Sequence, residues 1–363
     1  MVVVSPGFRP PFCPRAKCAY HRDPTGWRFK KTGFFHRSFP PRRVQRYLCL
    51  SCRVSFSFQT FQTTYWLKRP DLLATIFHRS LSCSGLRQIS RELDVAPSTV
   101  MRHCERLGRH CLLFQQQFRN RARTDEPLVA DGFESFEYSQ YHPCHFHLVV
   151  GSRSHFLHVF TDSELRRKGR MTVAQRRRRE QLERAFGRPD PKSIEREMAE
   201  ALRLVPGDGP IELHTDEHPA YRRALRRVGR PFRHVVTPSK QARTTSNPLF
   251  PVNLADLLIR HSGANHKRET IAFSKRRQGA AERLAIFQVW RNFVKEFSER
   301  RGGGTPAQRL GLVARKMTVR EVLAKRLFAS RVTLPGRLLR YYGRQITTRR
   351  IPRGRIHALV YAS

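Results

Sequence analysis

Short apolar runs bounded by Gly, Pro and polar residues recur through the middle of the chain, and such runs are typical of strands. Stretches with helical periodicity lie between and after them: a strongly charged one over 164–204, one from Pro219, one from Asn253 to Arg260, and one from Glu282 to Lys295. Strands that alternate with helices predict an α/β fold. The predicted strands cover residues 127–138, 145–150, 155–160, 211–215 and 233–237.

A helix-turn-helix pattern precedes this region. Residues 85–106 read GLRQISRELDVAPSTVMRHCER, two helical patterns joined by a short turn at Val95. An ordinary helical hairpin in a core is the alternative, but polar residues occupy the positions that face the major groove of DNA in such a unit. Ser98 suits either an N-cap or a phosphate contact. The residues expected to pack are Leu86, Ile89, Leu93, Val100 and Leu107, and those expected to contact DNA are Ser98, Thr99, Arg102 and His103.

The charge of the chain is extreme. Its 363 residues include 70 Lys and Arg but only 28 Asp and Glu, a formal net charge of +42. Such a charge indicates a polyanionic partner, and the 39% hydrophobic content excludes a disordered basic tail. The apolar runs are too short for a membrane-spanning helix, and residues 1–12 lack the pattern of a signal peptide. We therefore expect nucleic-acid binding in the cytoplasm.

The eight cysteines favour a metal site or free thiols over disulfides in such a chain. Cys13-x4-Cys18 and Cys49-x2-Cys52 are two short pairs, and each can present two thiolates to one tetrahedral zinc ion. A module of about 60 residues with few aliphatic side chains is barely stable without a metal. The sequence predicts a structural zinc ribbon, with four unrelated buried thiols as the alternative. The other cysteines, expected to be packing residues, are Cys83, Cys104, Cys111 and Cys144.

Acidic residues are almost confined to the middle of the chain. Residues 1–70 contain one acid, residues 300–363 contain one, and the remaining 26 lie between. Because acids repel a polyanion, some of them are expected to have a function. Asp131 lies in one predicted strand and Asp216 directly follows another, so the two would meet if these strands are neighbours. With a third acid on a nearby helix, they would form a site for two Mg²⁺ ions that serves phosphoryl transfer.

Three further features have competing interpretations. His142, Cys144, His145 and His147 resemble a metal-ligand set, but strand histidines with ordinary partners are favoured. The tract 166–172 (RRKGRMT) opens the charged stretch and suits either phosphate contacts or a solvated helical face. The tract 337–350 (RLLRYYGRQITTRR) suits either DNA contacts, including stacking on exposed bases, or a folded basic cap.

Taken together, these segments resemble the bacterial insertion-sequence transposases of the Asp-Asp-Glu/Asp type. The resemblance covers most of the chain, and its matching pieces are Cys13 and Cys18 with QRYLCLSC (45–52), the segment 85–106, VADGF (129–133), LHTDEHPAY (213–221), NLAD (253–256) and RETIAFSKR (268–276). It implies a ribonuclease-H-like catalytic domain, a mixed sheet with flanking helices. Such a domain cleaves transposon ends and transfers strands into target DNA with Mg²⁺. It also implies that Asp131 is the first metal-binding acid and Asp216 the second.

The third acid has two candidates. In the family, an Asn often stands three residues before the last acid, with a basic residue one helical turn later. Asn253, Asp256 and Arg260 match this pattern, with Asp in place of the usual Glu. The other candidate, Glu269, lies in a basic run that includes Lys267 and Arg268. This run is better suited to contact phosphates. The resemblance thus favours Asp256 as the acid, with Arg260, Lys267 and Arg268 as DNA contacts.

The expected organisation is a zinc ribbon (1–62), a helix-turn-helix domain (63–124), a catalytic domain (125–299) with a charged helical insertion at about 163–205, and a basic C-terminal segment (300–363) that follows a linker at 301–306. The expected function is Mg²⁺-dependent cleavage and strand transfer on double-stranded DNA. We expect a homo-oligomer to carry it out, because two ends must be paired. The expected location is the bacterial cytoplasm, at the nucleoid. One alternative is a regulator derived from a transposase that binds DNA without cutting. Another is an RNA-binding nuclease, which has no use for a helix-turn-helix.

Overall fold

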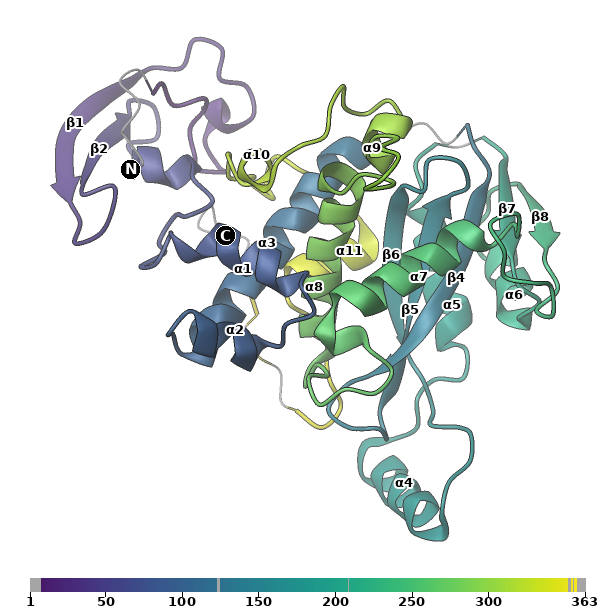
Figure 1. The fold of residues 1–363 in the computed structure, drawn as a ribbon. Helices are drawn as coiled ribbons and strands as arrows, with labels where there is room; N and C mark the ends of the chain where they lie inside the picture. The colour runs from purple at the N-terminus through teal and green to yellow at the C-terminus, as the bar shows by residue number, and fades with distance from the viewer. Residues whose placement is uncertain (1–7, 123–124, 208, 352–353, 355, 358–363) are drawn as a thin grey trace.

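The N-terminal part of the chain folds around a small antiparallel sheet of three strands. A computed structural model describes residues 8–122, 125–207, 209–351, 354, 356 and 357 (Figure 1). The order is β1-β2-β3, and aromatic side chains fill most of the small core between the strands and the cysteines. This agrees with the ribbon of strands expected here. The elements are η1 (Ala19–His21), β1 (Phe29–His36), β2 (Arg43–Cys49), β3 (Ser55–Ser57) and η2 (Phe58–Phe61).

Three helices follow: α1 (Leu72–Ser80), α2 (Leu86–Glu92) and α3 (Pro97–Arg119). Helix α2, the turn and the start of α3 coincide with the predicted helix-turn-helix. Helix α3 is 23 residues long and continues well past the expected unit, because its second half packs against α8 (Arg277–Val289). Gly108 permits this close packing, since a Cβ there would lie 2.8 Å from the Cα of Glu282. The N-cap is Ala96, so Ser98 does not cap the helix.

The central sheet has five strands in the order β6-β5-β4-β7-β8. Strands β4, β5 and β6 pair antiparallel, while β7 runs parallel to β4, and β8 runs parallel to β7. The protein is therefore a mixed α/β structure, as the alternating pattern predicts. The bounds are β4 (Leu128–Phe136), β5 (Pro143–Gly151), β6 (Leu157–Glu164), β7 (Ile211–Thr215) and β8 (Phe232–Val236).

Helices cover both faces of this sheet (Figure 1). Adjacent residues of β6 point in opposite directions: the Thr161 hydroxyl donates to the Glu197 carbonyl of α5 (Ser193–Arg203), whereas Asp162 meets Arg277 of α8. Helix α6 (Pro219–Arg226) packs beside α5, and α7 (Phe250–Ser262) lies against β4 and β5. Between α7 and α8, a short 3-10 helix, η3 (Ala264–His266), is buried.

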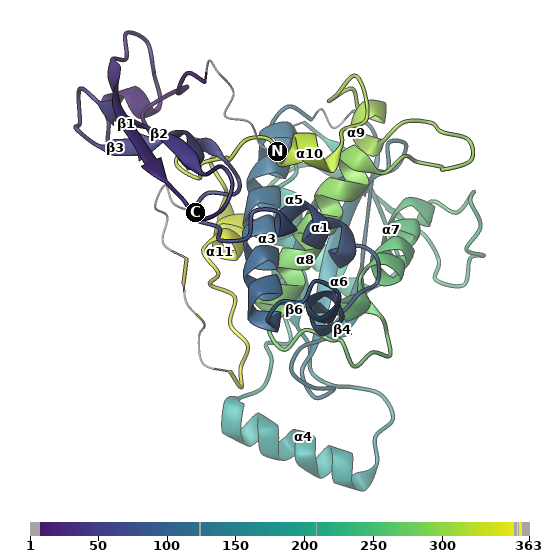
Figure 2. The ribbon, with the colours of Figure 1, turned by 60° about the vertical axis from the view of Figure 1, so that its left-hand side comes forward.

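The charged stretch divides into two helices with different roles. Helix α4 (Val173–Phe186) projects from the body in both views (Figures 1 and 2). Helix α5 belongs to the core, where Met198 and Ala199 are fully buried. The expectation of one insertion over 163–205 is therefore too wide: β6 runs to Glu164, and the apolar positions of α5 repeat at helical spacing against the sheet.

The C-terminal part is a folded cap and not an appended tail. Its elements are η4 (Trp290–Val294), α9 (Pro306–Arg309), α10 (Val319–Val322) and α11 (Gly336–Tyr342). Tyr341 and Tyr342 are buried, which removes them from stacking on nucleic-acid bases. The tract 301–306 is a tight turn where a linker was expected, because three successive glycines adopt positive φ, and the buried Thr305 caps α9.

A buried ionic network fastens this cap to the sheet. Asp162 on β6 is fully buried and pairs with Arg277 Nε at 2.7 Å and Arg337 Nη2 at 2.8 Å. The Tyr341 hydroxyl donates to the same carboxylate. Burial raises the pKa of Asp162, but the two guanidinium groups outweigh this effect and hold it below the usual value. The C-terminal segment thus supplies partners for a charge in the central sheet.

One hydrophobic core joins most of these elements. It contains Ile76 of α1, Val149 of β5 and Leu338 of α11, so the expected division near residue 124 does not correspond to a gap between cores. The aromatic core around the cysteines is separate, although Phe328 of the C-terminal segment packs into it. Within the described residues, no helix has the length and apolar character needed to cross a membrane.

His158 on β6 makes the core sensitive to acid. It is almost completely buried, neither ring nitrogen has a hydrogen-bond partner, and burial, aided by Arg119, lowers its pKa to about 3. In the unfolded chain His158 binds a proton near pH 6.5, whereas in the folded chain it stays neutral down to about pH 3. The contribution of neutral His158 to folding stability is therefore complete above pH 6.5 and is lost as the pH falls.

We therefore expect His158→Leu to reduce the acid sensitivity of folding. Between pH 7.5 and pH 5, urea unfolding should show the wild type losing about 2 kcal/mol more than the variant. The matched control is His261→Leu, which removes an exposed histidine of α7 and should lose as much as the wild type. Equal losses in all three proteins would contradict the assignment.

Candidate functional site

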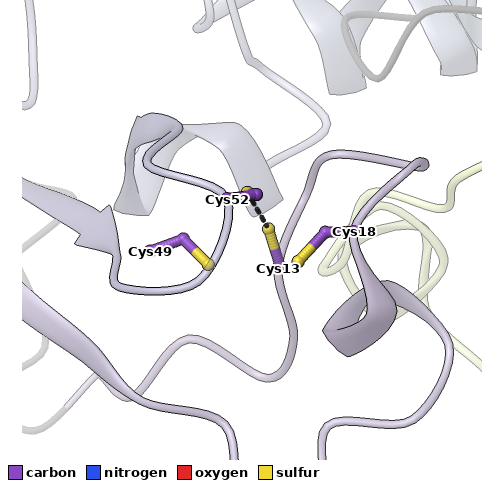
Figure 3. A group of neighbouring side chains, drawn as sticks. All are labelled: Cys13, Cys18, Cys49 and Cys52. Atoms are coloured by element: carbon purple, nitrogen blue, oxygen red, sulfur yellow. Dashed lines mark hydrogen bonds between the residues drawn. The ribbon is translucent and has the colours of Figure 1, made fainter.

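Four cysteines come together at one end of the small sheet (Figure 3). The Sγ atoms of Cys13, Cys18, Cys49 and Cys52 all lie within 4.8 Å of one another, and all four thiols are free. Zn–S bonds of about 2.3 Å in a tetrahedron require sulfur atoms about this close together. The first pair comes from the loop before η1, and the second flanks the turn after β2. The group could therefore bind a metal ion such as zinc.

The surroundings of these cysteines shift the pKa values of their thiols in different directions. Burial raises the pKa of Cys49, but the backbone N–H of Cys52, the indole of Trp27 and the backbone N–H of Ser51 lower it to about 7 in total. The indole Nε1 lies 3.3 Å from the Cys49 sulfur. Burial raises the pKa of Cys13, whose sulfur lies 3.5 Å from that of Cys52. A bound cation would offset the free-energy cost of bringing four cysteine thiols together.

The helix-turn-helix exposes a basic surface at its turn. An open hollow of about 460 Å³ lies there. At the start of α3, Ser98 and Arg102 are exposed and Thr99 is half-buried, so these three are accessible to a ligand. The residues that line the hollow are Arg87, Ser90, Arg91, Asp94, Val95, Ala96 and Pro97.

His103 is not accessible, contrary to the sequence-based expectation. Its Nδ1 lies 2.8 Å from the Thr99 carbonyl oxygen, its Nε2 lies 3.2 Å from that of Arg69, and only 4% of the residue is exposed. The carbonyl of Arg69 comes from the segment before α1, a contact between distant residues that the local pattern does not reveal. His103 therefore ties α3 to that segment and cannot read bases.

Asp131 and Asp216 lie on neighbouring strands. Val129 of β4 is paired with His214 of β7, so two residues further along the parallel pair Asp131 lies beside Asp216. Strand β7 ends at Thr215, and the Asp216 carboxylate then accepts a hydrogen bond of 2.9 Å from the backbone N–H of His218. This turn fixes Asp216 at the carboxyl end of its strand.

Asp131 is half-buried beside like charges. Burial raises its pKa to about 6, and the charges of Asp216 and Asp256 act in the same direction. The backbone N–H of Gly132 and the Tyr221 hydroxyl, which donates to Asp131 Oδ1 at 3.0 Å, oppose this effect. A carboxylate whose pKa is raised by two neighbouring aspartates lies in a site that a cation would stabilise.

Gly132 is required beside Asp131. A Cβ at this position would lie 2.2 Å from the Phe146 carbonyl oxygen and 2.5 Å from the His145 ring, so no other residue fits without a shift. His145 and His147 share one face of β5, with their Nδ1 atoms 3.2 Å apart, and His147 Nε2 lies 3.0 Å from the Ser163 hydroxyl. These contacts agree with strand histidines that have ordinary partners, the interpretation favoured from the sequence.

Asp256 reaches the same region from α7. Its Oδ1 accepts a hydrogen bond of 2.9 Å from Arg260 Nε, the i,i+4 pair expected from the sequence. Arg260 also donates to the carbonyls of His266 and Glu134, so its guanidinium is engaged within the protein. Burial raises the pKa of Asp256, although Arg260 opposes the shift. Arg260 therefore holds Asp256 in place and has few donors left for DNA.

A cleft of about 480 Å³ contains two of the three acids. Lys267 and Arg268 are exposed on its rim, where they can meet an anionic ligand. Glu269 is exposed and does not line the cleft. The lining consists of Asp131, Gly132, Phe133, Glu134, Ser135, Phe136, Gln140, Pro143, Arg243, Asn253, Asp256, Arg260, Lys267 and Arg268.

The three aspartates stand less close together than the cysteines. In the part of the chain that the structure describes, the cysteines are the only group of three or more His, Cys, Asp or Glu side chains gathered within 4.8 Å. Metal-free carboxylates repel one another, and Arg260 draws Asp256 to itself. To share a metal ion, Asp256 must turn from Arg260 toward Asp131.

The sequence did not single out Tyr221 or Arg243. Tyr221 lies in the LHTDEHPAY segment, and a phenol at i+5 from Asp216 on the first turn of a helix is the signal that would have identified it. Arg243 lies in the loop between β8 and α7, and only the fold brings it to the cleft.

Comparisons with known proteins add little to this geometry. No family model matches the chain, and no curated protein matches it. Among solved structures, the chain is similar to a chain of a cryo-electron-microscopy structure of the simian T-cell lymphotropic virus intasome in complex with the PP2A regulatory subunit B56 gamma. The match has 11% identity, a TM-score of 0.26, and coverage of 66% of this chain and 72% of the other. A likeness this partial does not establish a shared fold.

Proposed function

We propose that this protein is a DNA transposase of the Asp-Asp-Glu/Asp type, which cleaves the ends of a mobile element and joins them to target DNA. The observation that carries the proposal is that Asp131 lies beside Asp216 on neighbouring strands and shares a cleft with Asp256, in a protein of net charge +42. Carboxylates on such a basic chain are better suited to bind a cation that contacts a phosphate than to bind DNA alone, because carboxylates repel DNA.

The topology supports a ribonuclease-H-like catalytic domain. The strand that bears Asp131 is the central one: β5 pairs with it antiparallel on one side, and β7 and β8 run parallel to it on the other. This order places the end of β7, and with it Asp216, beside Asp131. The third acid comes from a helix that packs on the same strand.

The aspartates would hold two Mg²⁺ ions, which activate the attacking oxygen and stabilise the leaving oxygen in phosphoryl transfer. The side chains fit hard cations, since all three offer carboxylate oxygens. Tyr221 orients Asp131 by its hydrogen bond, and Arg260 holds Asp256 until the cations compete for it. Lys267 and Arg268 on the rim would contact the phosphates of the bound strand.

The N-terminal elements would select the DNA. Ser98, Thr99 and Arg102 at the start of α3 would enter the major groove, while the basic turn before them meets the backbone. The four cysteines would bind a structural Zn²⁺ ion that fixes the ribbon beside this unit. Two such chains would act together, because two element ends must be paired.

A cleavage assay tests the proposal. Its substrate is a supercoiled plasmid that carries the DNA flanking the protein's own gene, incubated with Mg²⁺ or with EDTA. We expect nicked and joined products only with Mg²⁺, and at least about 10³-fold less product from Asp216→Asn, because one carboxylate ligand is lost. Full activity of Asp216→Asn would rule out the assignment of this acid.

One observation favours a second candidate, a regulator that binds DNA without cutting it. The Asp256–Arg260 ion pair occupies the third acid, and a pair that persisted in the presence of Mg²⁺ would leave the site incomplete. This candidate predicts sequence-specific binding that is independent of metal and no product in the cleavage assay.

A further inference from the structure

We propose that residues 165–188, here called the α4 arm, form a second DNA-binding surface that holds the phosphate backbone of duplex DNA beyond the acid cleft. The inference rests on the proposed function and adds to it a site that neither the cleft nor the helix-turn-helix requires. The arm consists of a short loop and α4, which stands clear of the body in both views (Figures 1 and 2).

The arm carries a large excess of positive charge. It contains ten Lys and Arg and two Glu. Glu183 is already occupied, since it pairs with Arg166 at 2.8 Å and with Arg188 at 3.0 Å. Arg176, Arg177 and Arg178 are exposed and form no ion pair in the described structure. Neighbouring positive charges repel one another, so bound anions would stabilise the arm.

Packing does not account for α4. Leu182 is its one buried residue, and Val173 is 65% exposed. The helix is nevertheless well defined at its start, where Thr172 and Gln175 form a reciprocal capping box. A helix of 14 residues is about 21 Å long, enough to follow about six base pairs of duplex. A regular helix without a packed face is suited to display its arginines.

The arm is fixed to the body at its base. Arg349 of the C-terminal segment donates to the carbonyls of Phe186 and Gly187 at 3.1 and 2.7 Å, and the Arg350 guanidinium lies 5.5 Å from the centre of the Phe186 ring. At the other end, the guanidinium of Arg167 lies over the Tyr141 ring. These contacts at both ends set the direction in which the arm points.

The base of the arm adjoins the rim of the cleft. Gln140 on the loop between β4 and β5 and Pro143 at the start of β5 line the cleft, and Tyr141, which contacts the arm, follows Gln140 in that loop. DNA whose reacting phosphate lies at Asp131 therefore passes over this loop and reaches the α4 arm. The occupant is a duplex phosphate backbone, because its closely spaced negative charges complement the excess of exposed arginines on the arm.

The test compares two triple variants of the full-length protein. In the first, Arg176, Arg177 and Arg178 are changed to Gln. In the matched control, three exposed arginines near α9 and α10, at the opposite end of the molecule, are changed to Gln: Arg300, Arg301 and Arg320. Affinity for a fluorescein-labelled duplex of about 40 base pairs is measured between about 50 and 200 mM salt.

We expect the arm variant to reduce the slope of log affinity against log salt by about 3 and to weaken binding at 0.1 M salt by about tenfold or more, with the control within about twofold of the wild type. Unchanged circular dichroism verifies that the arm variant is folded. If its slope and affinity equal those of the control, the arm is not a DNA-binding surface. A wild-type protein that binds no duplex at all would instead overturn the proposed function.

Discussion

Asp131→Asn is expected to reduce Mg²⁺-dependent strand cleavage by at least about 10³-fold while leaving duplex affinity within about twofold of the wild type. The variant keeps the size of the side chain and an oxygen that can accept the Tyr221 hydrogen bond, so the fold is preserved. It removes the negative charge of Asp131, which interacts with those of Asp216 and Asp256. The substitution thereby removes an anionic ligand that a divalent cation needs. Product formation and filter binding on the same plasmid measure the two effects.

Glu269→Gln is the control for this result. Glu269 is exposed on the basic loop beyond the cleft lining, so its neutral variant should cleave within about twofold of the wild type. If Glu269→Gln abolishes cleavage and Asp256→Asn does not, Glu269 is the third acid, and the loop from 267 to 276 must move toward Asp131 when DNA binds. If none of the acid variants lowers cleavage, the product does not arise in this cleft.

Loss of the metal from the cysteine group is expected to unfold the ribbon. Cys49→Ser removes one of the four ligands and the sulfur that accepts the Trp27 indole N–H. Structural zinc contributes about 10 kcal/mol or more of apparent binding free energy to small modules, and this aromatic core is too small to replace it. Metal content should fall from one zinc per chain to none, and Trp27 fluorescence should shift toward that of an exposed indole.

Cys83→Ser provides the matched comparison, because this half-exposed cysteine lies outside the group. It should retain one zinc per chain and the wild-type fluorescence. The full chain is needed for both, since Phe328 packs in the aromatic core and His21 Nε2 lies 2.8 Å from the Ser330 hydroxyl. A Cys49→Ser protein with native fluorescence and proteolytic resistance would show that the ribbon does not depend on a metal.

Local patterns predicted much of this molecule. Residues 211–215 were expected to form a strand and do, because Ile211 and Leu213 alternate with polar residues there, with Gly and Pro before the segment and Asp216 after it. The cysteine spacing likewise predicted the group that the structure assembles. Each of these signals is local: the strand is marked by neighbouring residues, and each cysteine pair spans only a few residues. No tertiary information is therefore needed to interpret them.

The errors arose where distant contacts decide the outcome. His103 has the spacing of a groove-facing residue, but the Arg69 carbonyl captures it. The charge of residues 164–204 concealed the apolar face of α5, whose Met198 and Leu202 are buried against the sheet. Likewise, Arg260 was expected to grip DNA, and its ion pair with Asp256 could be predicted, but its two carbonyl partners could not.

The most direct test of the three-aspartate site is a crystal structure of the protein soaked with Mn²⁺, in which anomalous scattering locates the ions. We expect manganese bound by Asp131 and Asp216, with Asp256 turned away from Arg260 to complete the site. It is contradicted if the cleft binds no manganese at concentrations that occupy other sites and Asp256 remains paired with Arg260.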